Sequence, residues 1–120
     1  MDFNTVGSQF LELYYSKFDN ERAALSKLYR DSSMLSFEGE QYKGIQNIMG
    51  KYSSFGKVVH KITRFDIQPS IEGGVICFVI GELRIDENPL LFSQVFHICK
   101  FPTTGEFFCL NDIFRLNLVG

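Results

Sequence analysis

The sequence predicts an α+β protein in which three helices pack on one face of a curved antiparallel sheet. Its first half carries apolar residues at helical spacing, and its second half is a series of apolar segments separated by short polar turns. Helical segments followed by strand segments are typical of this fold class. The length agrees, because 120 residues fit one domain, which we expect to span residues 1–120.

The first two helices are predicted near the N-terminus. Residues 3–18 should form the first, because Val6 and Phe10 belong to a series of apolar residues that recurs every three or four positions. The short polar side chains of Asp19-Asn20 can accept hydrogen bonds from free backbone amides, so we expect them to cap the next helix. That second helix should cover residues 21–28.

A strand and a third helix follow. Met34–Phe37 begins a strand, and residues 38–41 contain the composition of a turn. Residues 44–54 should form the third helix, because Ile45 and Ile48 lie at helical spacing.

The second half predicts four strands joined by polar turns. These strands are Val58–Ile67, Val75–Ile85, Leu90–Phe101 and Phe107–Leu118. Consecutive strands that are joined by short turns must be antiparallel, because parallel neighbours need a long crossover connection.

Two of these strands predict how the protein assembles. In a sheet with one solvent-exposed face, each strand alternates between apolar and polar residues. The segments Val75–Ile80 and Val95–Cys99 barely alternate. Three helices can cover only one face, so we expect a homodimer that packs sheet to sheet. The alternative is that both faces are buried within one chain.

Composition and charge exclude several function classes. The net charge is −2, and the lysines and arginines are scattered singly, whereas a nucleic-acid-binding protein usually has a basic stripe. No segment approaches the roughly 20 apolar residues that span a bilayer. The N-terminus lacks the pattern of a targeting segment. The 13 phenylalanines, with no tryptophan, indicate a large core, an apolar pocket or both. We therefore expect a protein partner rather than nucleic acid or a membrane.

The cysteines predict neither a disulfide framework nor a metal site. Cys77, Cys99 and Cys109 are odd in number and lie inside apolar segments, so we interpret them as reduced core residues. No histidine forms a catalytic motif with them, and the spacings typical of metal ligands do not occur. We expect no cofactor.

Several short motifs together carry a family resemblance over nearly the whole chain. They are Tyr14-Tyr15, Phe18-Asp19-Asn20-Glu21-Arg22, Phe37-Glu38-Gly39, Gln68-Pro69, Gly81, Asp86-Glu87-Asn88-Pro89 and Asn111-Asp112-Ile113-Phe114-Arg115-Leu116. In this order and approximate spacing, the chain resembles the nuclear transport factor 2 family. The resemblance implies a cone-like fold, with three helices on a bent antiparallel sheet, and a dimer.

The resemblance also implies a function. The family carries the GTPase Ran in its GDP form, taking an aromatic side chain of Ran into an apolar cavity with an acidic rim. It crosses the nuclear pore by binding Phe-Gly repeats of nucleoporins weakly, so the implied location is the cytoplasm, the nucleus and the nuclear pore. Among the positions matching the Ran-binding residues, the resemblance implies a cavity lining of Phe37, Phe55, Val58, Phe78, Ile113 and Phe114, and rim carboxylates at Glu38 and Asp86; Asn88 is the remaining position. The positions matching the nucleoporin-binding residues are Phe3 and Asp19.

The chain departs from the family pattern in a few places. Asn88 stands where the family commonly has a carboxylate, so one ion pair with Ran is absent. Phe37 and Phe3 each replace a tryptophan, which keeps apolar area and loses an indole donor.

Two other functions stay open. The cone fold also hosts isomerases and dehydratases, and the candidate acids or bases here are His60, Asp112 and Glu38. Alternatively, the chain is a dimeric scaffold that binds other proteins. From periodicity alone, the phenylalanines would simply be core residues, and the acids solvated turn residues.

Overall fold

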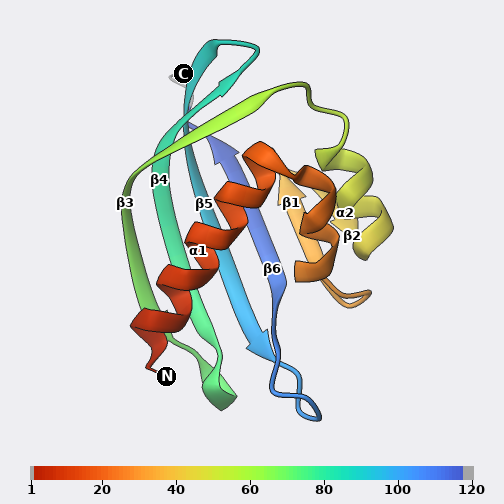
Figure 1. The fold of residues 1–120 in the computed structure, drawn as a ribbon, viewed down its shortest axis with the longest axis vertical. Coiled ribbons are helices and arrows are strands. Elements are labelled where there is room, and N and C mark those ends of the chain that lie inside the picture. Colours follow the sequence, from red (N-terminus) through yellow and green to blue (C-terminus); the bar gives the residue numbers. More distant parts are fainter. Residues whose placement is uncertain (1, 118–120) are drawn as a thin grey trace.

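The fold consists of a curved six-stranded sheet with the helices on one face (Figure 1). The computed structural model describes residues 2–117. The elements are α1 (Phe3–Asn20), the 3-10 helix η1 (Arg22–Leu28), β1 (Met34–Phe37), β2 (Glu40–Lys43), α2 (Ile45–Tyr52), β3 (Val58–Pro69), the 3-10 turn η2 (Ile71–Gly73), β4 (Val75–Ile85), β5 (Asn88–Lys100) and β6 (Phe107–Leu116). The predicted α+β class is confirmed; Leu118, the predicted end of the last strand, lies outside the described residues.

The strand order is β2-β1-β6-β5-β4-β3, and one strand pair differs from the prediction. Four of the five pairs are antiparallel, whereas β1 and β6 run parallel, with Phe37 beside Phe114. The long chain between these two strands satisfies the requirement for a crossover. The sheet is therefore mixed rather than wholly antiparallel.

Local turn chemistry explains the other differences. The predicted turn at 38–41 is tighter than expected: Glu38 and Gly39 alone form it, with positive φ angles of 52° and 89°, and β2 follows. The expected loop at 86–89 is also a two-residue turn, in which Asp86 and Glu87 have φ angles of 51° and 70°. Two-residue hairpins with positive φ at both positions match the natural twist of paired strands.

The end of the first helix also differs from the prediction. α1 continues to Asn20, and Asp19 does not cap the following helix, because both of its oxygens bond to His60 on β3. The second helix is a 3-10 helix without a side-chain cap. α1 begins where Asp2 accepts a hydrogen bond from the amide of Thr5 at 2.8 Å.

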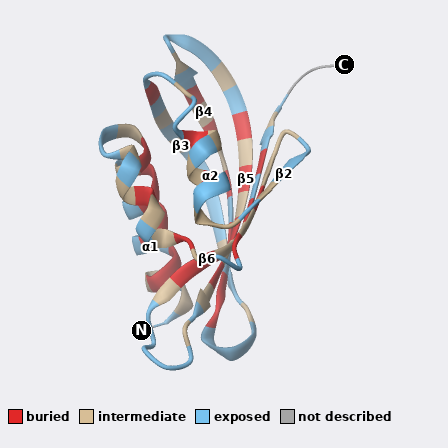
Figure 2. Cartoon of the chain, turned by 90° about the vertical axis from the view of Figure 1, so that its right-hand side faces the viewer, coloured by how far each residue is buried: buried red, intermediate tan, exposed pale blue. Residues whose placement is uncertain are grey.

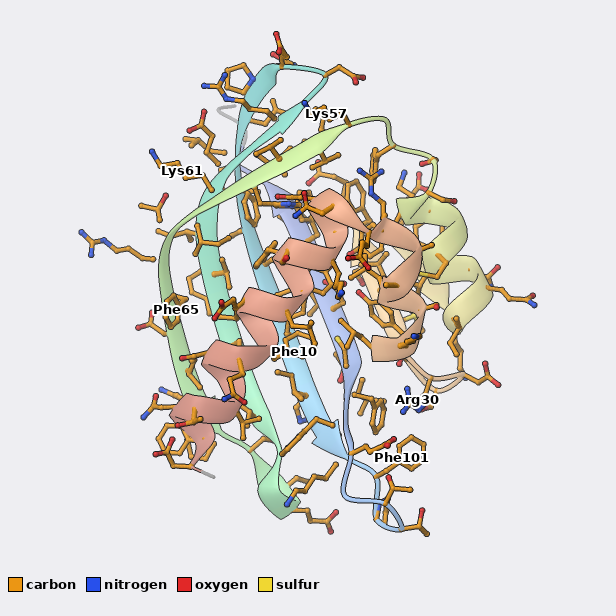
Figure 3. All side chains as sticks on the ribbon, viewed as in Figure 1. Phe10, Arg30, Lys57, Lys61, Phe65 and Phe101 are labelled. Carbon is orange, nitrogen blue, oxygen red and sulfur yellow. The ribbon has the colours of Figure 1, made fainter. Side chains whose placement is uncertain are left out.

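The core lies between α1 and the sheet. Phe10 points from α1 onto the sheet (Figure 3), and its ring packs edge-on against Phe96 of β5 at 5.3 Å. Tyr14, one turn further along α1, contacts the same ring at 4.6 Å. Cys77 and Cys109 are free thiols buried in this layer, and burial raises the pKa of Cys77 to about 12.

The other face of the sheet is open (Figure 2). Along β4, buried residues alternate with exposed or half-buried ones, and the outward positions include Ile76 and Phe78. Because Phe78 pairs with Val95 and Val95 pairs with Ile113, one apolar row crosses three strands on this face. The alternative that both faces are buried within one chain is therefore wrong for the described residues.

Gly81 allows the sheet to bend. It pairs with Ile62 of β3, immediately before a register shift between Ile62 and Arg64. A Cβ at position 81 would lie 2.5 Å from the carbonyl oxygen of Lys61 and 3.1 Å from the ring of Phe92. A glycine inside a strand commonly marks such a bulge or close approach.

We expect Gly81→Ala to lower the free energy of unfolding by about 3 kcal/mol, because the nearest clash is with backbone, which cannot rotate away. Urea unfolding measures this change. Gly50→Ala is the matched control, since nothing lies within 4 Å of a Cβ there. As a helix position, it should gain up to about 1 kcal/mol. Equal effects at both positions would contradict the role given to Gly81.

The helices carry no membrane-span signal. Within residues 2–117, none combines the length and the apolar character that crossing a bilayer requires.

Candidate binding cavity

An apolar cavity of about 140 Å³ lies between the sheet and the helices. Its wall combines residues from α1, β1, α2, the α2–β3 loop and strands β3 to β6. They are Tyr14, Phe18, Phe37, Tyr52, Phe55, Val58, His60, Leu83, Ile85, Gln94, Phe114 and Leu116. Although several of these residues are polar, the surface that they present to the cavity is apolar.

Stacked aromatic rings form one side of the cavity. The rings of Phe37 and Phe114 are parallel within 3°, with centroids 4.5 Å apart. The parallel pairing of β1 and β6 places these two residues side by side. Phe55 packs against Phe37 at 5.3 Å, and Phe92 continues the stack behind Phe114 at 5.5 Å. A further ring of similar size could therefore extend an existing stack.

Lys51 adds a positive charge beside this aromatic side. Its ammonium lies 4.8 Å from the ring centroid of Phe37 and 5.4 Å from that of Phe55. Such cation–π contacts are worth about 0.5–1 kcal/mol at exposed sites. Lys51 therefore helps to hold the two rings that form the cavity wall.

Two carboxylates lie next to the cavity wall, each at the first position of a hairpin turn. Glu38 follows the lining residue Phe37 and accepts a hydrogen bond from the amide of Leu116 at 2.5 Å. Asp86 follows the lining residue Ile85, and its carboxylate lies against Gly56. At the same end lies Lys57, which is labelled in Figure 3, and its carbonyl accepts a hydrogen bond from the amide of Asp86.

Arg22 ties together the segments around the cavity. Its guanidinium donates to the carbonyls of Phe18 at the end of α1 and Tyr52 at the end of α2. It also donates to the carbonyls of Phe55 and Gly56, both at 2.8 Å. Because carbonyls at helix ends lack partners within the helix, one guanidinium satisfies several acceptors at once. The loop that carries Phe55 is thus fixed to α1.

A buried carboxylate lies behind the cavity wall. Asp112, on β6, accepts hydrogen bonds from the hydroxyls of Tyr29 and Tyr52 at 2.7 Å each and from the amide of Gln94 at 2.8 Å. Tyr14 lies at 3.4 Å from the same carboxylate. Asp112 is 0% exposed and does not line the cavity.

Burial raises the pKa of Asp112 above its ordinary value of 3.8, against the opposing effect of hydrogen bonds from Tyr52, Gln94 and Tyr29. A carboxyl with a higher pKa in the folded state binds its proton preferentially there. Its contribution to stability is therefore full below pH 3.8 and is lost as the pH rises through the folded-state pKa.

We expect this titration to be visible against Asp112→Asn, which cannot titrate. The free energy of unfolding of the wild type, relative to this variant, should increase as the pH falls from about 7 towards about 4. Urea unfolding at several pH values measures the difference. A difference that stays constant or decreases over this range would contradict the assignment.

His60 is the imidazole of the cavity wall, and Asp19 holds it. Its Nδ1 lies 2.6 Å from Oδ1 of Asp19, and its backbone amide donates to Oδ2 at 2.8 Å. The ring packs between Tyr15 and Phe18, with centroids at 4.8 and 5.0 Å. This contact fixes the end of α1 to β3.

The structure separates the predicted cavity residues into two groups. Phe37, Phe55, Val58 and Phe114 line the cavity. The expectation that Phe78 and Ile113 also line it is wrong, because they are 42% and 48% exposed on the opposite face of the sheet. Side chains alternate along a strand, so Phe114 and its neighbour Ile113 must face opposite ways.

The remaining predicted residues lie at three places. Glu38 and Asp86 occupy the hairpin turns beside the cavity, and Asn88 is exposed at the start of β5, paired with Ile85. Phe3 and Asp19 lie near opposite ends of α1, about 24 Å apart at 1.5 Å per residue. Within one chain these two do not form a common site.

Sequence reasoning missed several residues of the site. Leu83 and Ile85 could have been found, because they share a face of β4 with the buried Val79. For Lys51 and the Asp112 cluster, no local pattern marks the contact, because the partners lie far apart in the sequence.

Comparison with known proteins identifies the family. A nuclear transport factor 2 domain profile matches residues 6–116. The chain belongs to the nuclear transport factor 2 family. It is 48% identical to nuclear transport factor 2 of Candida glabrata, covering 98% of this chain and 96% of the relative. It is also 48% identical to nuclear transport factor 2 of Oryza sativa, covering 98% of both chains.

A solved structure of the family agrees with the fold. Nuclear transport factor 2 from Cryptosporidium parvum superposes with a TM-score of 0.89 at 46% identity, covering 96% of this chain and 94% of that one. Relatives that match over nearly their full length are nuclear transport factors, which supports a nuclear transport role for this chain.

Proposed function

We propose that the protein carries Ran in its GDP form through the nuclear pore. The observation that carries the proposal is an apolar cavity of about 140 Å³ with a carboxylate on each of the two hairpin turns beside it. An apolar cavity of about 150 Å³ is known to hold a benzene molecule, so this one has the size for a single aromatic side chain. As the family resemblance implies, that side chain comes from a switch region of Ran.

The cavity and its rim would contribute to Ran binding in different ways. Burying one aromatic side chain is worth about 1.5–3 kcal/mol. Glu38 and Asp86 then pair with basic groups of Ran, which sets the orientation of the partner and speeds association. Asn88 can still donate or accept a hydrogen bond, but it adds no charge. The rim thus carries two carboxylates.

Backbone strain at the rim supports a binding role for its acids. Glu38 and Asp86 both adopt positive φ, a region that non-glycine residues seldom occupy. Such residues concentrate at functional sites, where the surrounding structure maintains the strain. Glycine would form either turn more easily and would supply no charge.

The test is a calorimetric titration of the chain with Ran in both nucleotide states. We expect binding of the GDP form and, because GTP rearranges the switch region, at least tenfold weaker binding of the GTP form, a difference of about 1.4 kcal/mol. Equal affinity for the two forms, or none for either, would overturn the proposal.

The open face of the sheet is the proposed dimer interface. The row Phe78, Val95 and Ile113 lies across three neighbouring strands, and Ile76 extends it. Contiguous exposed apolar residues of this kind usually mark an interface. A second copy related by a two-fold axis would cover the row with the same row.

Weak binding of Phe-Gly repeats completes the proposed carrier. Phe3 is half-buried at the start of α1, where its ring can meet an aromatic ring of a repeat. Such a carrier would be found in the cytoplasm, the nucleus and the nuclear pore.

We do not assign catalysis to the cavity. A general acid or base must reach the substrate. Asp112 lies behind the tyrosines of the wall, Glu38 is bonded to a backbone amide, and Nδ1 of His60 is bonded to Asp19. Asp112 and Glu38 therefore already have structural partners, and Asp19 occupies one of the two ring nitrogens of His60.

A further inference from the structure

Three polar side chains form a hydrogen-bonded cluster on the open face of the sheet, away from the cavity. His97 of β5 lies at its centre. Its Nδ1 is 3.1 Å from Oδ1 of Asn111 on β6, and its Nε2 is 2.9 Å from Oγ of Ser70, which precedes η2. The thiol of Cys99 lies 3.6 Å from the same Nε2. All four residues are half-buried in one chain.

The contacts of this cluster suit a neutral imidazole. Because Oδ1 of Asn111 can only accept, Nδ1 of His97 carries the hydrogen, and Nε2 accepts from the hydroxyl of Ser70. Protonation would place a second hydrogen on Nε2, where Ser70 already directs its own. The hydroxyl would then have to turn away and find another acceptor. The neutral ring is therefore satisfied at both nitrogens as it stands.

The cluster borders the apolar row of the proposed dimer interface. His97 follows Val95 of that row by two positions on β5, and it pairs with Ile76 of β4 on one side and with Asn111 of β6 on the other. Residues two apart on a strand point to the same face and lie about 7 Å apart. His97 therefore occupies the next row of the same face.

A second copy that covers the apolar row also covers this cluster. A specific interface buries about 800 Å² on each partner. With strands about 4.8 Å apart and rows about 7 Å apart, a row of three residues accounts for only roughly 100 Å². The interface must therefore extend over several rows, and the row of His97 directly adjoins the apolar one.

The groups closest to His97 cannot neutralise a positive ring. Among residues 2–117, no carboxylate oxygen lies within 4 Å of its ring nitrogens. Burial, and then the charge of Glu72 on η2, raise the pKa of Cys99, so its thiol stays protonated and uncharged. The ammonium of Lys100 is directed to the ring of Phe107, 5.5 Å away, and would repel a second positive charge.

Other charged residues of the open face are more distant. On the flanking strands they lie two or more rows from His97, at least roughly 13 Å away; they are Glu82 and Arg84 of β4 and Arg115 of β6. The remaining ones lie two strands away on β3 or three strands away on β2; they are Lys61, Arg64, Asp66 and Lys43. A charged His97 would therefore depend on water.

We propose that His97 makes the dimer sensitive to pH, so that mild acidification dissociates it. The inference rests on the proposed function, in which the open face of the sheet is the dimer interface. Histidine is the side chain that ordinarily changes its charge between pH 5 and 8. In the monomer, water hydrates a charged His97. In the dimer, the second copy removes this water, and the described carboxylates of the same chain are too distant to replace it.

The direction of the effect follows from proton linkage. A dimer that excludes a proton which the monomer accepts binds fewer protons, so a fall in pH favours the monomer. Because a two-fold interface contains the cluster twice, each dimer excludes two protons. The dimer is therefore stable at neutral pH and weakens as the pH falls below about 7. Acidification would also lower the avidity for Phe-Gly repeats, because a monomer offers one copy of each binding site.

Sedimentation equilibrium of the wild type at about pH 7.5 and about pH 5.5, at equal ionic strength, tests the proposal. We expect the dissociation constant of the dimer to be at least about tenfold higher at the lower pH. Over this range histidine side chains change their charge, whereas carboxylates with ordinary pKa values stay ionised. The chain has two histidines, and the other, His60, lies on the helix side of the sheet, bonded to Asp19.

Two variants assign the effect to His97. His97→Gln keeps a donor for Asn111 and an acceptor for Ser70 but cannot titrate. His97→Leu cannot titrate either, and it adds an apolar side chain beside the apolar row. In both variants we expect the dissociation constant to change less than about threefold over the same pH range. Glu72→Gln is the matched control: it removes the charge that acts on Cys99 and should keep the wild-type pH dependence.

The outcomes separate this inference from the proposed function. A wild-type dimer whose dissociation constant does not change with pH refutes the role of His97 and leaves the interface intact. A pH dependence that persists in His97→Gln or in His97→Leu has the same meaning, so either variant decides if the other does not fold. A wild type that is monomeric at both pH values refutes the interface and this inference together, whereas calorimetry with Ran-GDP tests the carrier role independently.

Discussion

Glu38→Lys should reduce the binding of Ran-GDP at least about thirtyfold while the protein stays folded. Truncating one partner of a desolvated charge pair costs about 2–5 kcal/mol, and a lysine adds repulsion from the basic groups of the partner. Glu38 is well placed for this effect, because it follows the lining residue Phe37 and is fixed by the amide of Leu116. Calorimetric titration with Ran-GDP measures the loss.

Two further variants make the result specific. Glu38→Gln keeps an acceptor for the amide of Leu116 and removes only the charge, so it should retain the melting temperature and lose part of the affinity. Phe3→Ala, at the far end of α1, should weaken binding of Phe-Gly repeats and leave Ran-GDP binding unchanged. If Glu38→Lys binds Ran-GDP like the wild type, this rim is not the binding site.

Ile113→Lys should convert the proposed dimer into monomers, raising the dissociation constant at least about a hundredfold. The side chain is 48% exposed in one chain and lies in the apolar row on the open face. In a two-fold interface each substitution occurs twice, so two charges would be desolvated at once, at a cost of several kcal/mol. Analytical ultracentrifugation measures the change.

Leu13→Lys is the matched control for this experiment. Leu13 is similarly exposed, at 43%, but it lies on α1, on the opposite side of the sheet. It should leave the dimer unchanged. A dimer that survives Ile113→Lys, or that dissociates equally with Leu13→Lys, would show that the interface does not lie on the open face of the sheet.

The order and type of most elements could be predicted from the sequence, because local spacing determines them. The repeat of Val6 and Phe10 predicted α1, and the bounds of β4 were predicted to the residue. The parallel pairing of β1 with β6 could not be predicted, because nothing in Met34–Phe37 distinguishes a partner 77 residues away from a nearer one.

The main error in the predicted site concerned the face of the sheet on which each strand residue lies. Phe114 and Ile113 were both assigned from the family resemblance, and because both are apolar, their side chains gave no reason to separate the residue that lines the cavity from its outward neighbour. An alternating strand would have identified the inner face, but a sheet that is apolar on both faces removes this signal.

The cluster around Asp112 could not be predicted for a different reason. Its hydrogen bonds join residues up to 98 positions apart, and each tyrosine looks locally like an ordinary core residue. Only the fold brings the donors to one acceptor.

The parallel pairing of β1 with β6 has a consequence for biosynthesis. Phe37 leaves the ribosome 77 residues before its stacking partner Phe114. Phe37 therefore lacks this partner until β6 has been translated, and loop closure over this distance slows folding. A nascent chain that stops before β6 would display an unfinished aromatic surface, a natural target for chaperones.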